Sequence, residues 1–444
     1  MNKIDYVVTS TTKYIEQMTK AQRKKYGQFF TSKETAVFMA ELFDLQSASG
    51  AVSILDPGAG SGILSTALIE RMLDVAAITK IKLVCYESDT NILELLRSNM
   101  DWVCAHASKP IEYKIVADNY ILSQMADYNH MLWESPNPPK YDYVIGNPPY
   151  MKIPKDAPEA LAMPDVCYGA PNLYFIFASM SLFNLKSDGE MVYIIPRSWT
   201  SGAYFKKFRQ KFLDEGALEH IHLFVSRDKV FEKESVLQET IIIKVKKAKN
   251  KPQNVTITTT QSNADFSQKT VFHAPYDTVV NGKDQYVYLV TNAKEVETLE
   301  RLNRLPNTLP SIGLKMKTGL TVDFRNREAL RDHAEATAVP LFYSQHIKNG
   351  KVEFPIGKEH EYLVTEQNGL LQKNSNYLFV KRFTAKEEHR RLQCGIYLAR
   401  KHPEYREIST QNKINFICGL HELSECVVYG LYVLFNSTLY DLSL

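Results

Sequence analysis

The chain has 444 residues, of which 44% are hydrophobic, 23% charged and 11% aromatic. This composition excludes a largely disordered chain, and the length exceeds what one hydrophobic core usually serves, so we expect two domains. The formal net charge of +3 sums two unequal parts, because residues 1–240 carry 25 basic and 29 acidic side chains and residues 241–444 carry 28 and 21. The basic second part predicts a surface that meets a polyanion.

The sequence contains no apolar run of about 18 residues that would span a bilayer, and its first residues lack the apolar core of a signal peptide. Its six cysteines are scattered, with no Cys-x-x-Cys pair. That pattern is not typical of a disulfide framework or of a thiolate metal site. We therefore expect a cytoplasmic protein that binds neither a membrane nor a metal ion.

Hydrophobic periodicity predicts helices and strands that alternate through the first 240 residues. Helices are expected at residues 12–25, 32–43, 63–72, 90–100 and 174–185, and strands at residues 52–55, 81–86, 113–116, 141–145 and 191–195. This alternation predicts a Rossmann-like α/β domain built on a doubly wound parallel sheet.

The alternation stops near residue 240, where β-like runs at residues 240–245 and 255–260 flank a basic stretch. We place the first domain at residues 1–245 and a linker with connecting strands at residues 246–300. A second domain of mixed α+β type is expected at residues 301–444.

A glycine-rich turn, Asp56-Pro57-Gly58-Ala59-Gly60, separates the first predicted strand from the helix that follows it. Glycine lets the backbone approach a ligand closely, and a helix N-terminus offers unpaired N–H groups. A tight turn without a ligand is the alternative. No Gly-Lys-Ser/Thr follows, so the turn differs from a phosphate-binding loop, and the acid at its start favours a ligand with positive charge.

Two further acids, Glu87 and Asp118, follow the second and third predicted strands. A carboxylate in the first position can accept hydrogen bonds from both hydroxyls of a ribose, and one in the second position can accept from an adenine amino group. Together with Asp56 they favour an adenosine ligand that carries positive charge. S-adenosylmethionine is such a ligand, and NAD is the alternative.

The fourth predicted strand runs directly into Asn147-Pro148-Pro149-Tyr150. Two prolines stiffen this turn, so that the Asn147 side-chain oxygen and the Pro148 carbonyl can face one point. Two converging acceptors suit a planar NH2 group, and drawing on both of its hydrogens would localise the nitrogen lone pair for attack. Tyr150 would supply a ring on which a base stacks. An upstream Asn-Pro-Pro copy at residues 137–139 follows no apolar strand, and we interpret it as a surface loop.

These motifs, in this order, resemble the gamma-class DNA adenine-N6 methyltransferases of restriction–modification systems, the family of the Taq enzyme. The resemblance implies direct methyl transfer from S-adenosylmethionine to N6 of an adenine that has left the base stack of duplex DNA, without a covalent intermediate or a metal ion. It assigns the cofactor to Tyr26, Gly27, Thr31, Asp56, Pro57, Gly58, Ala59, Gly60, Glu87, Asp118, Asn119 and Pro149. It assigns catalysis to Asn147, Pro148 and Tyr150, and stacking of the flipped base to Tyr150 and Phe231.

The second domain resembles the target-recognition region of the same family, which implies double-stranded DNA as its partner. Its candidates for phosphate contact are Lys381, Arg382, Arg390 and Arg391, and the basic stretch at residues 244–251 is another candidate. The resemblance further implies a monomer on DNA and a separate cognate restriction endonuclease. In many relatives more sequence follows an element like Asn436-Ser437, so we expect a recognition domain that is either compact or shortened at its C-terminus.

Two other functions remain open from the sequence. The same tetrad occurs in methyltransferases that act on a protein glutamine amide or on RNA amino groups, although those chains generally lack a large basic domain after it. A DNA-binding subunit that keeps the fold without turnover is the other alternative, and the intact acids and tetrad speak against it. The sequence shows no nuclease cluster of carboxylates and lysine, so we expect no DNA cleavage by this chain.

Overall fold

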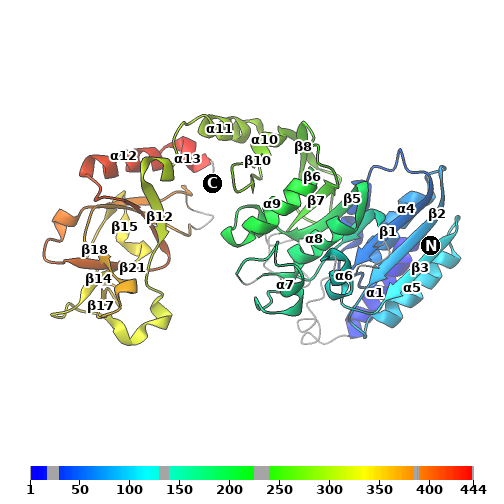
Figure 1. Cartoon of the computed structure of the whole chain (residues 1–444), viewed down its shortest axis with the longest axis horizontal. Coiled ribbons are helices and arrows are strands. Elements are labelled where there is room, and N and C mark those ends of the chain that lie inside the picture. Colours follow the sequence, from blue (N-terminus) through cyan, green and yellow to red (C-terminus); the bar gives the residue numbers. More distant parts are fainter. Residues whose placement is uncertain are drawn as a thin grey trace. The chain divides into compact units, whose positions relative to one another are not determined.

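The computed structural model describes residues 2–17, 30–129, 140–169, 171–224, 240–384, 388 and 390–442. The chain divides into two units, Met1–Ala293 and Lys294–Leu444, and each is described by itself (Figure 1). No helix in the described parts of either unit is long and apolar enough to cross a membrane.

In the first unit nine of the described strands form one sheet in the order β3-β2-β1-β4-β5-β7-β6-β8-β9, and β10 Val280–Asn281 and β11 Tyr286–Val287 form a separate two-stranded sheet. Strands β1 to β5 are parallel, whereas β7 runs antiparallel to its neighbours β5 and β6. The strand bounds are β1 Gly50–Pro57, β2 Ile78–Tyr86, β3 Ile111–Val116, β4 Tyr141–Gly146, β5 Leu185–Pro196, β6 Ala217–Phe224, β7 Thr240–Lys246, β8 Asn254–Thr260 and β9 Thr270–Pro275. The central strands are apolar along most of their length because both faces of the sheet are covered.

Helices cover both faces of this sheet (Figure 1). Val192 and Ile194 of β5 belong to a core that α1, α3, α4 and α5 also build. Tyr193, between them, points to the other face, where its hydroxyl lies 2.6 Å from that of Ser181 in α8. The helix bounds are α1 Lys3–Gln17, α3 Lys33–Glu41, α4 Ile63–Leu73, α5 Leu93–Ala105, α6 Tyr120–Tyr128, α7 Pro158–Ala162, α8 Leu173–Asn184, α9 Lys206–Glu215 and α10 Tyr276–Val279.

The structure confirms the predicted alternation and the parallel sheet, including Ser32 as the N-cap of α3. The first predicted helix, at residues 12–25, was started too late, because α1 begins at Lys3; residues 12–17 are helical, and residues 18–25 lie outside the described part of the chain. Residues 246–300 were expected to hold a linker with connecting strands, and β8 and β9 in that range pair into the nine-stranded sheet of the first unit, which extends to Ala293. Their β-branched residues predict strands but do not indicate which sheet the strands join, so they could not be attached to the first domain from the sequence.

The order of the strands places a site at the carboxyl edge of the sheet. Strand β1 pairs with β2 on one side and with β4 on the other, so the chain reverses its direction of winding between them. A ligand crevice forms at such a reversal, beyond the carboxyl ends of the strands. The turns that follow β1, β2, β3 and β4 therefore meet at this edge.

In the second unit the described strands form two sheets. The six-stranded sheet has the order β12-β22-β19-β20-β16-β15, with bounds Leu314–Thr318, Ile414–Gly419, Tyr377–Lys381, Cys394–Tyr397, Lys351–Val352 and Ile347–Lys348. The five-stranded sheet has the order β13-β17-β14-β21-β18, with bounds Leu330–Arg331, Tyr362–Leu363, Val339–Phe342, Glu407–Thr410 and Gln372–Lys373. Helices α11 Ala293–Asn303, α12 Glu425–Phe435 and α13 Thr438–Leu442 complete this unit, and α12 packs its Val428, Leu431 and Phe435 on the six-stranded sheet.

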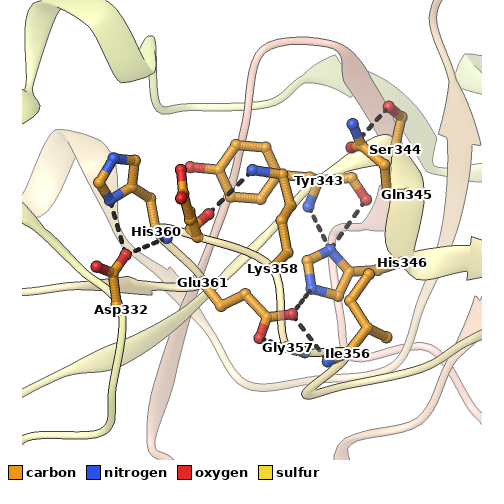
Figure 2. Close-up of polar contacts among 11 residues, drawn as sticks. Asp332, Tyr343, Ser344, Gln345, His346, Ile356, Gly357, Lys358, His360 and Glu361 are labelled. Carbon is orange, nitrogen blue, oxygen red and sulfur yellow. Dashed lines mark hydrogen bonds and ion pairs between the residues drawn. The ribbon is translucent and has the colours of Figure 1, made fainter.

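A buried polar network includes Tyr343 and His346, which lie between β14 of the five-stranded sheet and β15 of the six-stranded sheet, and Glu361, which precedes β17 (Figure 2). The Tyr343 amide donates to His346 Nδ1 at 2.8 Å, so the imidazole proton sits on Nε2, which donates to Glu361 Oε1 at 2.8 Å. The Glu361 carboxylate also accepts the backbone amides of Ile356, at 2.8 Å, and Gly357, at 3.0 Å. His346 is fully buried and Glu361 nearly so, and burial lowers the pKa of His346. A neutral imidazole and a fully bonded carboxylate thus fix the surface loop at residues 356–360.

The turn between β1 and α4 requires glycine at position 62. Gly62 has φ +84°, and an added Cβ would lie 2.6 Å from Met100 Cε and 3.0 Å from Leu96 Cδ1, both in fully buried side chains. Gly50, at the start of β1, has φ +69° but open space around it. The two positions separate the cost of the backbone conformation from the cost of the clash.

We expect Gly50→Ala to lower the free energy of unfolding by about 1–2 kcal/mol, the cost of a left-handed conformation for a residue with a Cβ. Gly62→Ala adds an overpacking cost of about 1–3 kcal/mol to the same conformational cost. Urea unfolding of both variants against the parent chain measures the difference. Equal losses at the two positions would show that Met100 and Leu96 do not confine the turn.

Candidate cofactor and substrate site

A cavity of about 410 Å³ opens at the carboxyl edge of the parallel strands, and its volume is in the range of small-molecule sites. It is lined by Phe30, Gly58, Gly60, Tyr86, Glu87, Ser88, Asp89, Thr90, Asn91, Asp118, Tyr120, Asn147, Pro148, Pro149 and Phe177. Seven of the residues that the sequence assigned to the site are in this lining: Gly58, Gly60, Glu87, Asp118, Asn147, Pro148 and Pro149. The structure thus brings together the turns after β1, β2, β3 and β4.

The carboxylate of Glu87 joins two of these turns. Its Oε2 accepts the backbone amide of Gly60 at 2.8 Å, and its Oε1 accepts that of Asp89 at 2.9 Å. Burial raises the pKa of Glu87, while the two amide bonds oppose that shift by favouring the ionised form. Each carboxylate oxygen can accept more than one bond. Glu87 can therefore hold its own turns and still accept hydroxyl groups from a ligand.

Asp118 follows β3 and is exposed in the cavity wall, where its Oδ1 accepts the amide of Asn119. Asn119 itself is not in the lining. Its side-chain oxygen caps α6 by accepting the Leu122 amide at 3.1 Å, and its Nδ2 donates to Glu159 at 2.8 Å. The sequence had assigned Asn119 to the cofactor, but in the structure its polar atoms support a helix start.

Asp56 lies behind the cavity wall and not at its mouth, where the sequence had placed it. The side chain is fully buried, its Oδ2 accepts the hydroxyl of Ser65, and its Oδ1 has no hydrogen-bond partner among the described residues. Burial raises the pKa of Asp56 to about 7, the bond from Ser65 opposes the shift, and the charge of Glu87 adds to it. Pro57 and Ala59 are likewise absent from the lining, although the Ala59 amide bonds Tyr86 O at 2.9 Å and so fixes the turn.

Asn147 is held on both sides of its carboxamide. Its Nδ2 donates to Thr31 Oγ1 at 3.2 Å, and Tyr150 Oη lies 2.8 Å from its Oδ1. The same tyrosine oxygen lies 2.9 Å from the carbonyl oxygen of Ile194 in β5, so its single proton can go to either acceptor. Thr31 and Tyr150 are outside the cavity lining, and they act here by orienting Asn147. The Tyr150 ring meets that of Tyr174 edge-on, with centroids 6.3 Å apart.

A second support for the glycine turn comes from α5 and was not visible in the sequence. The amide nitrogen of Asn99, a fully buried side chain, donates to Ser61 O at 2.8 Å. Its oxygen accepts the hydroxyl of Ser10 in α1 at 2.6 Å. The turn is therefore connected to α1 through one buried carboxamide.

The cavity wall contains aromatic residues that the sequence did not identify. Phe30, Tyr86, Tyr120 and Phe177 line it, and Phe177 lies opposite Gly58, whose missing Cβ leaves that space open. Tyr86 and residues 88–91 flank Glu87, so extending the motif along the chain would have found them. Phe177 lies within α8 at ordinary helical spacing, and no local signal marks it as a ligand contact.

Several predicted positions lie outside the described residues: Tyr26, Gly27 and Phe231, together with the upstream Asn-Pro-Pro copy at residues 137–139. Within the described residues, no three His, Cys, Asp or Glu side chains gather into a metal site.

The predicted DNA-contact residues of the second unit differ in their exposure and in the hydrogen bonds that they make within the unit. Lys381 Nζ donates to Gln393 at 2.6 Å, and half-buried Arg390 donates to Ser437 O at 3.3 Å near α13. Arg382 and Arg391 are exposed, and Arg382 Nη1 donates to Asn412 O at 3.2 Å. Arg390 therefore serves the packing of α13, whereas Arg382 and Arg391 are accessible to a ligand.

The basic stretch at residues 244–251 belongs to the first unit and faces away from the cavity. Strand β7 starts at the carboxyl edge, where Thr240 pairs with Pro196, and runs to the opposite edge. There Lys244 forms ion pairs with Glu190 and Glu219, Lys246 pairs with Asp188, and Lys247 and Lys251 donate to backbone carbonyls. Counted by unit, residues 1–293 carry 32 basic and 32 acidic side chains, and residues 294–444 carry 21 and 18. The second unit thus has a net charge of +3 and the first a net charge of 0. This difference is smaller than the one between residues 1–240 and residues 241–444.

The Eco57I restriction-modification methylase family matches residues 73–231. Type II methyltransferase M.PstI of Providencia stuartii is 35% identical over 433 residues, which are 94% of this chain and 83% of that protein. Type II methyltransferase M.BsuBI of Bacillus subtilis is 32% identical over 432 residues, with the same coverage. The solved type IIL restriction-modification enzyme MmeI in complex with DNA covers 97% of this chain and 61% of its own, with a TM-score of 0.51 and 10% identity. At that identity the likeness shows the fold alone.

The buried carboxyl of Asp56 makes stability depend on pH. Its pKa is about 7 in the folded chain, against an ordinary value of 3.8 for an aspartate. Below the lower value the group is protonated in both states. Between the two values only the unfolded chain releases the proton, so the free energy of unfolding falls by up to about 1.4 kcal/mol per pH unit, and above about pH 7 the loss is constant.

We expect Asp56→Asn to lack this decline, so that the parent chain loses stability relative to the variant between about pH 4 and pH 7. Urea unfolding across that range measures the difference. Ser65→Ala removes the bond that favours the ionised form, and should extend the decline to higher pH. Parallel pH profiles of the parent chain and Asp56→Asn would contradict the assignment.

Proposed function

The chain belongs to the type II methyltransferases of restriction–modification systems, and we propose that it transfers a methyl group from S-adenosylmethionine to N6 of an adenine in duplex DNA. The observation that carries the proposal is one cavity lined both by Glu87 and by Asn147-Pro148. The first is suited to a nucleoside and the second to an amino group. Two reactants bound side by side gain most of their rate from orientation.

The residues of the cavity fit S-adenosylmethionine. Glu87 presents a carboxylate that is already oriented by two backbone amides, as the hydroxyls of a ribose require. Asp118 is an exposed acceptor in the same wall, and Phe177 and Tyr120 provide apolar surface. Gly58 and Gly60 leave the space that side chains would fill. When bound, the cofactor would supply a methyl group activated by a sulfonium.

Asn147 is prepared to receive an amino group. Its Nδ2 is committed to Thr31, so the carboxamide is oriented with Oδ1 as acceptor. A carboxamide oxygen accepts two hydrogen bonds, so the bond from Tyr150 is compatible with a second one from a substrate. The Pro148 carbonyl would take the other amino hydrogen, and the nitrogen lone pair would then be localised for attack. The target base must leave the duplex to reach this point.

The ring of Tyr150 would stack on the extruded base, an interaction worth about 1–3 kcal/mol per base. Its hydroxyl, between Asn147 Oδ1 and Ile194 O, prevents the ring from rotating away. Phe231 is proposed for the opposite side of the base on the resemblance alone. Tyr26 and Gly27 are proposed on the same ground to contact the methionine part of the cofactor.

Double-stranded DNA is the proposed partner, and the second unit, residues 294–444, is proposed as its recognition domain. A unit of this size beyond the tetrad favours DNA over a protein glutamine amide or an RNA amino group. We further propose that the chain acts as a monomer in the cytoplasm and that a separate chain supplies the cognate restriction endonuclease.

We expect Asn147→Ala to reduce the transfer of labelled methyl from S-adenosylmethionine to duplex DNA by about 100-fold or more, as removal of one preorganised polar contact to a transition state does. The matched control is Asn137→Ala in the upstream Asn-Pro-Pro copy, which should keep full transfer. Mass spectrometry of the digested product should find N6-methyladenine. Label on RNA or protein and never on DNA would contradict the proposal.

A further inference from the structure

Three segments of the second unit leave the six-stranded sheet at the same end. Thr318, the last residue of β12, pairs with Asn415 of β22, and Val380 of β19 pairs with the same residue from the other side. The segment at residues 319–325 follows β12, residues 382–384 follow β19, and the turn at residues 410–413 precedes β22. We refer to these three segments together as the Phe–Arg edge.

Backbone hydrogen bonds join the three segments into one surface. The Asn412 amide donates to Thr321 O at 2.9 Å, and the Thr321 amide donates to Thr410 O at 2.9 Å. The Arg382 amide donates to Lys413 O at 3.0 Å. At Gly319 an added Cβ would overlap the Gln411 carbonyl, so the close approach depends on glycine. Main-chain contacts therefore join the three segments, and the Arg382 side chain adds one bond, from Nη1 to Asn412 O at 3.2 Å.

Two phenylalanine rings on this edge are exposed to solvent. Phe324 is 62% exposed and Phe383 is 66% exposed. Each has the arginine next to it in sequence over its ring, with Arg325 5.6 Å from the Phe324 centroid and Arg382 5.4 Å from the Phe383 centroid. Large exposed rings contribute nothing to the core, so a binding role accounts for them better than folding does.

The cations of the edge are available for a polyanion. Arg325, Arg382 and Lys413 are exposed, and none of the ion pairs among the described residues includes them. The outer face of α12 offers a contrast, because its exposed Val427, Val433 and Leu434 are apolar without a basic residue on the helix. Rings interleaved with unpaired cations are typical of nucleic-acid surfaces, whereas an apolar helix face is not.

We infer that the Phe–Arg edge contacts duplex DNA, with Phe324 and Phe383 packing against bases and Arg325, Arg382 and Lys413 binding the flanking phosphates. This inference rests on the proposed function, which names DNA as the substrate. Apolar side chains that enter a duplex unstack base steps and kink the helix axis, and such local opening lowers the cost of extruding a neighbouring base. The edge thus gives the recognition unit a part in preparing the substrate.

The two kinds of side chain have different signatures in DNA binding, measured by fluorescence anisotropy on a labelled duplex that carries the methylated site. Phe324→Ala and Phe383→Ala should each weaken binding by about 5- to 100-fold with an unchanged salt dependence, because a stacking contact is lost. Arg325→Ala and Arg382→Ala should each reduce the slope of log affinity against log salt by about 1, because a phosphate contact is lost.

Matched controls are Val433→Ala on α12, which is 67% exposed, and Arg304→Ala on α11, whose side chain is 79% exposed. Both should bind as the parent chain does. A 2-aminopurine beside the target adenine should brighten on binding of the parent chain and less on binding of the phenylalanine variants. Circular dichroism confirms that each variant is folded.

Normal binding by both phenylalanine variants would overturn the assignment of the rings, and unchanged salt slopes in both arginine variants would overturn that of the cations. If the parent chain binds S-adenosylmethionine but methylates no DNA, the proposed function fails. If it methylates DNA and the four edge variants do so equally well at limiting DNA concentration, the inference fails while the proposed function stands.

Discussion

The carboxylate of Glu87 is the contact on which the cavity depends. It accepts one amide from the turn after β1 and one from the turn after β2. It therefore fixes the distance between two turns that are far apart in the sequence. A buried carboxylate is costly unless it is bonded, and the two amides supply those bonds. The same atoms remain suited to a hydroxyl-bearing ligand. One group thus supports the structure and stays available to a ligand, and the sheet order that brings β1 beside β2 makes this possible.

Much of this site could be predicted from the sequence because a residue's position directly after a strand is enough to place it in this fold. In a parallel sheet each strand ends at the same edge, so any residue that directly follows a strand is a candidate for the site. That reasoning found Glu87, Asp118 and the tetrad at Asn147. It placed Asp56 wrongly, because the direction of a side chain depends on a partner, Ser65, that lies on the first turn of α4. It could not find Phe177 or Asn99, which reach the site from the interiors of helices.

The second unit was less predictable for a physical reason. Its strands are short, several of only two residues, so they leave no periodic pattern. Counting basic residues marked Lys381 and Arg390, whose polar atoms are engaged within the unit, and it marked the lysines at residues 244–251, which belong to the first unit. Phe324 has no signal in the sequence, since a lone phenylalanine is normally a core residue. Its significance rests on exposure and on strand register, which are properties of the folded chain.

The network around Glu361 has a consequence for how the surface of the second unit can change over evolutionary time. Its carboxylate accepts hydrogen bonds from the main-chain amides of Ile356 and Gly357 and so holds the loop at residues 356–360 (Figure 2). Those bonds do not depend on which side chains the loop carries. Gln345, exposed beside it, can therefore be exchanged while the scaffold persists, whereas Lys358 is half-buried with its Nζ 4.0 Å from the Tyr343 ring centroid. A domain with this arrangement can change its exposed side chains by substitution without first losing the fold that presents them.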